Sequence, residues 1–259
     1  ALYYKAVHFV NMEEYDTAIH YLQKSLEPAL KIKDRKQEAK VLNDIGVCYY
    51  HQNNLAYTID YVKRSLAIRE ELQDDEGLRN AYNNMAFIYK ETGMVDSALV
   101  LNFKSLAIAE KTGNVANIGN SYNNIGQIYH TLLLEYDKGL EYYKKSLVLR
   151  EKTGIKKDIA LQKNNIAAVY SDMGDQQEAL KWYNEALELR REINHKYGVI
   201  NTLNNIASTY IRMKEFDKPK PFLDEAFELN KVLGDKNMEL AIQRSYAAFY
   251  KEKNQPDIA

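Results

Sequence analysis

The sequence repeats itself at a period of 40 residues, with one step of 41, and this period limits the possible folds more than any other feature. Four copies are close in wording. Each begins with Asn-Asn, continues with an apolar residue and then Ala or Gly, and carries Tyr six residues after the first Asn; they begin at Asn83, Asn123, Asn164 and Asn204. Weaker copies extend the series towards both ends. A fixed period of this length is typical of stacked supersecondary units.

We therefore expect one array without an internal domain boundary over residues 1–259. Its repeats are predicted at approximately 1–38, 39–78, 79–118, 119–159, 160–199, 200–239 and, in part, 240–259.

Three columns of mostly small residues predict that each repeat is a pair of helices. The first column is Gly46, Ala86, Gly126, Ala167 and Ala207, and the second is Ala18, Thr58, Ala98, Gly139, Ala179 and Pro219. The third is Ser25, Ser65, Ser105, Ser146, Ala186 and Ala226. Small residues at fixed places allow two helices to approach closely, while Leu and aromatic neighbours fill the remaining space. The repeat is thus predicted to be a helical hairpin.

Turn residues indicate where the helices of each hairpin end and begin. Gly93 and Gly174 follow the expected end of a first helix. N-caps of second helices are predicted at Asp16, Asp96, Asp137, Asp217 and Asp257. In the sixth repeat Pro221 is expected to remove a backbone hydrogen bond, so that the second helix starts irregularly.

This pattern of small residues, with Tyr three places after the first of them, resembles the tetratricopeptide repeat (TPR) family over the entire chain. The family's usual unit is about 34 residues, so the longer unit here implies longer helices. The amino-acid sequence of the Asn-Asn-Ile-Gly/Ala blocks resembles that of repeats in kinesin light chains, Pins-type spindle-orientation adaptors and bacterial Rap-type peptide receptors. The resemblance implies an all-α fold, a right-handed solenoid of stacked helical hairpins.

Charge and composition argue against several classes of partner. The formal net charge is -1, from 35 basic and 36 acidic residues that are interspersed, so we expect no nucleic acid partner. No apolar run of about 18 residues occurs, and no membrane contact is expected from this segment. The single cysteine, Cys48, does not separate cytoplasm from periplasm. Of the two compartments we expect the cytoplasm.

Chemistry-bearing motifs are sparse in this sequence. The five histidines lack metal-ligand spacing, and no glycine-rich phosphate loop or GxSxG motif occurs. We expect no metal, no cofactor and no catalysis. An aromatic column on the second helices is expected to belong to the core; it comprises Tyr21, Tyr61, Tyr142, Trp182 and Phe222.

The candidate site is the face of each first helix that lies opposite the buried columns. This stripe is dominated by asparagine, which is less favourable than Ala within a helix by roughly 0.5 kcal/mol. We predict a peptide-binding groove formed by Asn84, Asn124, Asn165, Asn205, Asn80, Asn120, Asn201, Phe87, Gln127, Asp172 and Arg212.

In the TPR family the first helices line a concave groove, and Asn at the places of Asn84, Asn124, Asn165 and Asn205 commonly binds the backbone of an extended peptide. Asp44 departs from this pattern in the second repeat. The adjacent column is expected to bond to a neighbouring repeat instead; it comprises Asn43, Asn83, Asn123, Asn164 and Asn204.

The resemblance therefore implies a non-catalytic scaffold whose partner is a peptide or protein segment. The alternative is a regulatory sensor segment of a larger bacterial signalling protein, such as a histidine kinase or a transcription regulator. Both chain ends fall inside a repeat, and Tyr246, Phe249 and Tyr250 form an apolar face without a partner helix. On this ground we expect a fragment, or the ordered part, of a longer protein.

Overall fold

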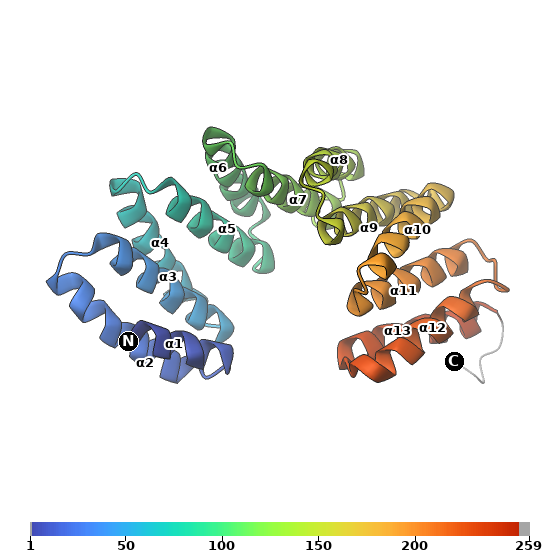
Figure 1. The fold of residues 1–259 in the computed structure, drawn as a ribbon, viewed down its shortest axis with the longest axis horizontal. Coiled ribbons are helices and arrows are strands. Elements are labelled where there is room, and N and C mark those ends of the chain that lie inside the picture. Colours follow the sequence, from blue (N-terminus) through green and yellow to red (C-terminus); the bar gives the residue numbers. More distant parts are fainter. Residues whose placement is uncertain (1, 254–259) are drawn as a thin grey trace. The chain divides into compact units, whose positions relative to one another are not determined.

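The computed structural model describes residues 2–253, which are almost entirely helical (Figure 1). Thirteen helices follow one another in this part of the chain, and no strand occurs in it. They are α1 (Leu2–Asn11), α2 (Tyr15–Lys31), α3 (Arg35–His51), α4 (Leu55–Glu71), α5 (Asp75–Glu91), α6 (Val95–Thr112), α7 (Val115–Thr131), α8 (Tyr136–Thr153), α9 (Lys156–Met173), α10 (Gln176–Glu192), α11 (Lys196–Arg212), α12 (Pro219–Leu233) and α13 (Lys236–Glu252). The predicted all-α class and stack of helical hairpins are confirmed.

The helices belong to two compact units, which we describe separately. Unit 1 ends at Ser121 and unit 2 begins at Tyr122. Within unit 1 each helix from α1 to α6 packs on the next, and the first helices α3 and α5 also contact each other. Within unit 2 the same order holds from α8 to α13, and α11 contacts α13. Odd-numbered helices are thus the first helices of the hairpins.

The small-residue columns lie where the two helices of a hairpin approach most closely. Gly126 and Ala167 are buried, as predicted. A methyl group added at Gly126 would lie 2.8 Å from Cδ1 of Tyr143, closer than real contacts allow. The period in the sequence therefore reflects a steric requirement of helix packing.

Aromatic stacking joins the two helices of several hairpins. Within residues 2–253 the aromatic column of the second helices forms stacked pairs with first helices, at ring-centroid distances of 5.4, 5.5, 5.6 and 5.7 Å: Phe9–Tyr21, Tyr49–Tyr61, Tyr129–Tyr142 and Tyr210–Phe222. Trp182 is partly buried and packs against the cluster of Tyr143, Leu147, Ile166 and Val169. The aromatic column of the second helices is therefore part of the core.

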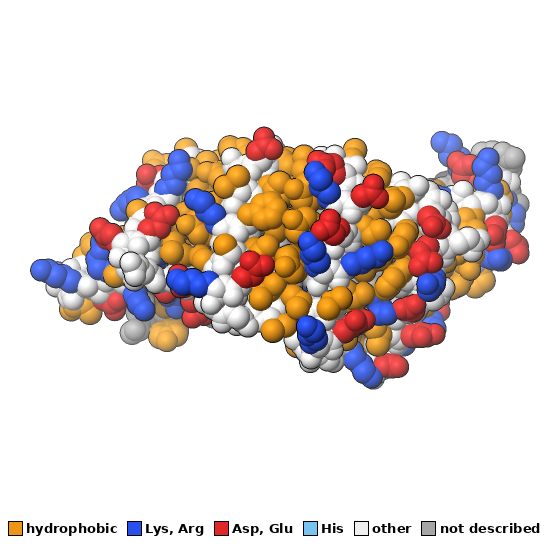
Figure 2. Space-filling view, turned by 90° about the horizontal axis from the view of Figure 1, so that it is seen from above, with side chains coloured by type: hydrophobic (Ala, Val, Ile, Leu, Met, Phe, Trp, Pro, Cys, Tyr) orange, Lys and Arg blue, Asp and Glu red, His pale blue; other side chains and the backbone are white. Residues whose placement is uncertain are grey.

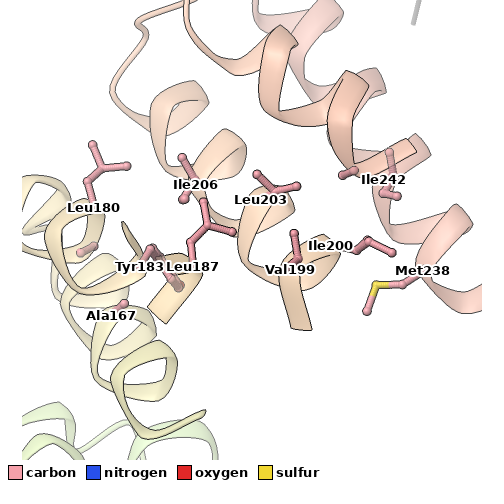
Figure 3. Close-up of a cluster of buried hydrophobic side chains, with 12 residues drawn as sticks. Ala167, Leu180, Tyr183, Leu187, Val199, Ile200, Leu203, Ile206, Met238 and Ile242 are labelled. Atoms are coloured by element: carbon pink, nitrogen blue, oxygen red, sulfur yellow. The ribbon is translucent and has the colours of Figure 1, made fainter. Parts of the chain in front are cut away.

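The largest described cluster of buried apolar side chains lies in unit 2 (Figure 3). It joins Ala167, Leu180 and Leu187 of one hairpin to Leu203 of α11 and Ile242 of α13. Ala167 and Leu203 are both fully buried. In unit 2 the hairpin of α9 and α10 thus shares its core with apolar side chains of the helices that follow.

Gly93 and Gly174 follow the ends of first helices, as predicted, but the described turns also contain left-handed residues of other types. Gly174 ends α9 in the left-handed conformation, with φ of 89°. Seven other residues reach positive φ without being glycine: Glu13, Lys33, Asn53, Gln73, Leu134, Asn194 and Lys214. A left-handed residue in this turn is therefore a property of the hairpin, which glycine favours but does not have to supply.

The predicted N-caps are wrong. Asp16, Asp96 and Asp137 each lie inside the first turn, one residue after the helix begins, where a carboxylate still interacts favourably with the helix dipole. Asp217 precedes α12 by two residues, and Asp257 lies outside the described residues. The described side chains that do accept a capping hydrogen bond are Asp34, Asn54, Asn114, Asp175 and Asp235, on helices α3, α4, α7, α10 and α13.

An irregular start was predicted for α12, and the helix begins only at the position of the second small-residue column. It begins at Pro219, and Pro221 therefore lies in the first turn, where the backbone N–H has no partner within the helix. Pro221 removes no helical hydrogen bond.

The C-terminal apolar face is also less open than predicted. Phe249 is only 2% exposed and packs near Ile211 and Leu223 of the preceding hairpin.

Lys163 stands in an apolar column, and its charge has partners at the edge of the core. Its ammonium forms an ion pair with Glu185 and lies 5.2 Å from the ring centre of Trp182. The Trp182 indole Nε1–H donates to Glu178 Oε1 at 3.0 Å. The lysine stem thus packs with the core while its charge stays paired, a common solution for an amphipathic side chain.

Candidate functional site

The predicted groove residues of unit 1 lie on α5 and α7 with their side chains partly or largely open to solvent. Asn80 and Asn120 are exposed, and Asn84 is partly buried. Phe87 is 48% exposed, lies edge-on to Tyr50 at 5.7 Å, and carries the Lys90 ammonium over its ring at 5.2 Å. This first-helix face of unit 1 therefore presents amides beside an exposed aromatic ring.

Unit 2 carries seven of the predicted groove residues on three first helices. The amides of α7, α9 and α11 are partly buried: Asn124, Gln127, Asn165, Asn201 and Asn205. Asp172 and Arg212 are exposed at the C-terminal ends of α9 and α11.

A polar chain links those helix ends in unit 2. Arg212 Nη1 lies 3.2 Å from Asp172 Oδ1, and it donates to Ser171 Oγ at 2.9 Å. The ring Nε2 of the buried His130 lies 3.0 Å from the second carboxylate oxygen of Asp172. Asp172 is therefore shared between α7 and α11, and it holds the two flanking first helices in register.

The two asparagine columns bond to each other across neighbouring repeats. Asn84 Nδ2 donates to Asn43 Oδ1 at 3.4 Å, and Asn165 Nδ2 donates to Asn123 Oδ1 at 3.0 Å. In both pairs the donor belongs to the predicted peptide-binding column and the acceptor to the column expected to tie repeats together. An amide has two N–H groups and one oxygen, so one such bond does not exhaust its capacity.

Other members of the column that was expected to bond to a neighbouring repeat have different surroundings. Asn164 Oδ1 accepts from Arg190 Nη1 at 3.1 Å. The Oδ1 atoms of Asn83 and Asn204 are buried without a hydrogen-bond partner among the described residues.

Asp44 replaces asparagine in unit 1 and is held by two donors. The Tyr3 hydroxyl donates to Oδ2 at 2.7 Å, and Asn43 Nδ2 donates to Oδ1 at 3.3 Å. Burial raises the pKa of Asp44, although these hydrogen bonds and the charges of Lys40 and Arg69 lower it. The carboxylate is thus partly desolvated at a position where the next four repeats carry a neutral amide.

Two cavities flank Asp44. One of about 540 Å³ lies between α3 and α5 and reaches the end of α4; Asn43, Arg69 and Asn80 line it. The other, of about 240 Å³, lies between α1 and α3. Asp44 lines both cavities.

Family models match two stretches of the sequence. Residues 117–192 match one tetratricopeptide repeat model and residues 200–232 match another. The chain contains tetratricopeptide repeats. A search of curated proteins finds no match.

Solved structures show that the fold of these TPRs extends beyond the matched stretches. A signal transduction ATPase with a tetratricopeptide repeat sensor from Pyrococcus horikoshii superposes with a TM-score of 0.82 at 19% identity, over 98% of this chain and 38% of its own. The apo quorum sensor NprR from B. thuringiensis gives a TM-score of 0.67 at 18% identity, over 96% of this chain and 70% of its own.

Repeats of a putative kinesin light chain from Podosopora anserina give a TM-score of 0.65 at 14% identity, over 76% of this chain and 96% of their own. At these identities the likeness concerns the fold. The predicted likeness to kinesin light chain and Rap-type arrays is confirmed at that level.

A column of buried arginines near the ends of second helices in the TPR array was not predicted. Arg69, Arg150 and Arg190 are all less than a tenth exposed. Gly77 and Gly198 make room for two of them, since a methyl group at Gly77 would lie 1.9 Å from Arg69 Nη1. In the sequence these residues could have been recognised because each arginine stands four residues after the third small-residue column, at Ser65, Ser146 and Ala186.

The described residues offer little for other kinds of site. No group of three or more His, Cys, Asp or Glu side chains within residues 2–253 is arranged to hold a metal ion. Among the described helices none combines the length and the hydropathy needed to cross a membrane. On the face in Figure 2, basic and acidic side chains are interspersed rather than gathered by sign.

Proposed function

We propose that the first-helix faces of this TPR array bind an extended segment of a partner peptide or protein, without catalysis. The observation that carries the proposal is the row of partly exposed amides on successive first helices, at Asn84 in unit 1 and at Asn124, Asn165 and Asn205 in unit 2. An amide both donates and accepts, so it matches a peptide backbone irrespective of side chains.

The inter-repeat bonds of Asn84 and Asn165 are compatible with this role. They fix the orientation of each amide before a ligand arrives, which lowers the entropy lost on binding. They also mean that the amides contribute to packing, so a binding experiment must be separated from a stability experiment.

Side-chain selection would come from the groups beside the amides. In unit 1 these are the exposed ring of Phe87 and the polar cavity of about 540 Å³ between α3 and α5. In unit 2 they are Gln127, Asp172 and Arg212, of which the last two already form an ion pair. A charged group of the partner would have to compete with that ion pair, which is exposed and therefore weak.

The proposal is tested with peptides selected from a random display library against the whole chain. Asn165→Ala and Asn84→Ala are expected to weaken the selected peptides by about 0.5 to 1.5 kcal/mol, the usual net value of a neutral hydrogen bond. Titration calorimetry measures affinity, and thermal melts measure the accompanying loss of stability. Asn184→Ala on the second helix α10 is the matched control, because this asparagine donates to the Leu180 carbonyl of its own helix.

Unchanged peptide affinity in Asn84→Ala, Asn165→Ala and their double variant would contradict the proposal. The amides would then serve only to join neighbouring repeats.

A second candidate function is that of a sensor segment in a larger signalling protein. It is favoured by the likeness to the TPR sensor of the Pyrococcus horikoshii ATPase, of which this chain spans about 38%. Both functions need a binding face, but only the sensor needs a bound partner to change an attached activity. Assay of the full-length protein with and without a selected peptide separates them.

A further inference from the structure

The cavity between α1 and α3 of unit 1 combines apolar walls with a single charged group. Its lining consists of Tyr3, Val7 and Val10 of α1, Leu22 of α2, and Asp44 and Val47 of α3. Leu22 is fully buried and closes the floor. The cavity measures about 240 Å³. A ligand group that fits must therefore be largely aliphatic and must end in a group that a carboxylate binds.

Asp44 has hydrogen-bond donors but no ion-pair partner among residues 2–253. Partly buried carboxylates are stabilised by a nearby cation, because hydrogen bonds from neutral groups only partly replace the lost water. The ammonium of Lys40 lies over the Tyr3 ring, 4.5 Å from its centre, and Lys40 itself is exposed. Lys40 and Arg69 act on Asp44 from beyond ion-pair distance, so the carboxylate can still form an ion pair with one further cation.

The geometry favours an ammonium over a guanidinium. Tyr3 already donates to one oxygen of Asp44, and Asn43 donates to the other. A guanidinium binds best when both oxygens accept side by side, whereas an ammonium is a compact charge that needs one lone pair. A lysine side chain also carries a four-carbon stem that packs on apolar surface.

We propose that this cavity receives a lysine side chain of the bound segment, with its ammonium on Asp44 and its stem on Val7, Val10 and Val47. This inference rests on the proposed function and names the chemistry of one subsite of the same face. It assigns a role to the one carboxylate in a column whose next four repeats carry amides, at Asn84, Asn124, Asn165 and Asn205.

The repeats of this chain provide an internal comparison. Asparagine at position 44 would also accept the Tyr3 hydrogen bond, and it would do so without a charge to desolvate. Burial raises the pKa of the carboxyl group at this position, so its ionised form lowers the stability of the fold at neutral pH. A binding role accounts for this cost, as is common where a site needs a destabilised group.

The test uses peptides selected from a random display library against the whole chain, followed by a double-mutant cycle. Each selected lysine is replaced in synthetic peptides by norleucine, which keeps the stem and removes the charge, and by arginine. Affinities are measured by titration calorimetry for the parent chain and for Asp44→Asn. Asp60→Asn is the control, because Asp60 is an exposed aspartate on the second helix α4.

We expect one lysine whose replacement by norleucine weakens binding to the parent about tenfold and hardly changes binding to Asp44→Asn. Val7→Phe fills the cavity and keeps the carboxylate, and it should weaken binding of the lysine-containing peptide to a similar extent. Thermal melts of both variants confirm that they are folded.

Two results overturn the inference while leaving the proposed function intact. In the first, peptides lose affinity in Asn84→Ala but bind Asp44→Asn as tightly as the parent. In the second, norleucine or arginine replaces lysine without loss. Peptides that respond to none of the three substitutions, at positions 44, 84 and 165, contradict the proposed function itself.

Discussion

Asp44 and Asn84 occupy the same place in successive repeats but differ in charge, and this difference affects stability. The Asp44 pKa is raised above its ordinary value of 3.8, chiefly by burial. A carboxyl with a raised folded-state pKa contributes stability that is complete below the unfolded pKa and is lost as the pH rises through the folded pKa. At neutral pH the ionised Asp44 therefore opposes folding.

Asp44→Asn is accordingly expected to increase the free energy of unfolding at pH 7. The gain should shrink as the pH falls through the raised pKa of Asp44, because the carboxyl group then becomes protonated in the folded chain. Urea denaturation of both proteins at several pH values measures the difference, with Asp60→Asn as the control. A variant less stable than the parent at pH 7, or a difference that is independent of pH, would contradict the assignment.

Ala167 illustrates how little space the packing columns leave. It is fully buried and belongs to the main cluster of unit 2. Ala167→Leu should overpack this cluster and lower the free energy of unfolding by roughly 1 to 3 kcal/mol. Ala168→Leu, one residue along the same helix and partly exposed, should cost much less. Equal losses in chemical denaturation would show that the buried face of α9 is misassigned.

At the scale of helices, the buried arginines fasten the end of one hairpin to the start of the next. Arg190 Nη1 donates to the Gly198 carbonyl at 2.8 Å, to Asn164 Oδ1 at 3.1 Å and to Thr202 Oγ1. Burial lowers the pKa of Arg190 to about 10, so the guanidinium stays charged at neutral pH.

The equivalent Arg69 has fewer acceptors. It donates from Nε to Ser65 Oγ at 3.2 Å and lies 3.4 Å from Asp74 Oδ2. The place of Thr202 is taken by Ala81, and the guanidinium lines the larger cavity instead.

Arg190→Leu is therefore expected to destabilise the chain more than Arg69→Leu does. Loss of Arg190 removes the donor to the buried Asn164 Oδ1 and one of the donors to the Gly198 carbonyl, at a cost of about 1.5 to 3 kcal/mol. Equilibrium denaturation of the two variants under identical conditions gives the comparison. The reverse order would mean that Asp74 and Ser65 hold Arg69 more firmly than their distances indicate.

Sequence and structure agree best where sterics dictate the residue. The small-residue columns are dictated by close helix approach, and they predicted the buried faces of Gly126 and Ala167 correctly. Helix starts were predicted less well, because Asp96 favours both an N-cap and a first turn and only the backbone decides between them.

The bond from Asn165 to Asn123 joins residues 42 apart, so it depends on the spacing of neighbouring repeats and on rotamers. Periodicity alone could not assign it. The Asn columns themselves were nevertheless visible in the sequence, and so was the departure at Asp44.

For the whole molecule, a repeat period that matches the helical hairpin implies that repeats can be removed in register. Deletion of residues 160–199 joins the first turn of α9 to the matching place in α11, and the product should remain helical and melt cooperatively. Deletion of residues 160–179 removes half a period and joins helix faces that do not match. Circular dichroism should show loss of cooperative melting only in the second deletion; the opposite result would contradict a modular array.

Trp182 is the single tryptophan of the chain, and it lies in unit 2 between Lys163 and Glu178. Its fluorescence therefore reports only on the surroundings of α10, whereas far-ultraviolet circular dichroism reports on every helix. Coincident denaturation curves from the two signals would indicate one cooperative transition. Separate curves would give the melting of unit 2 without any added dye or label.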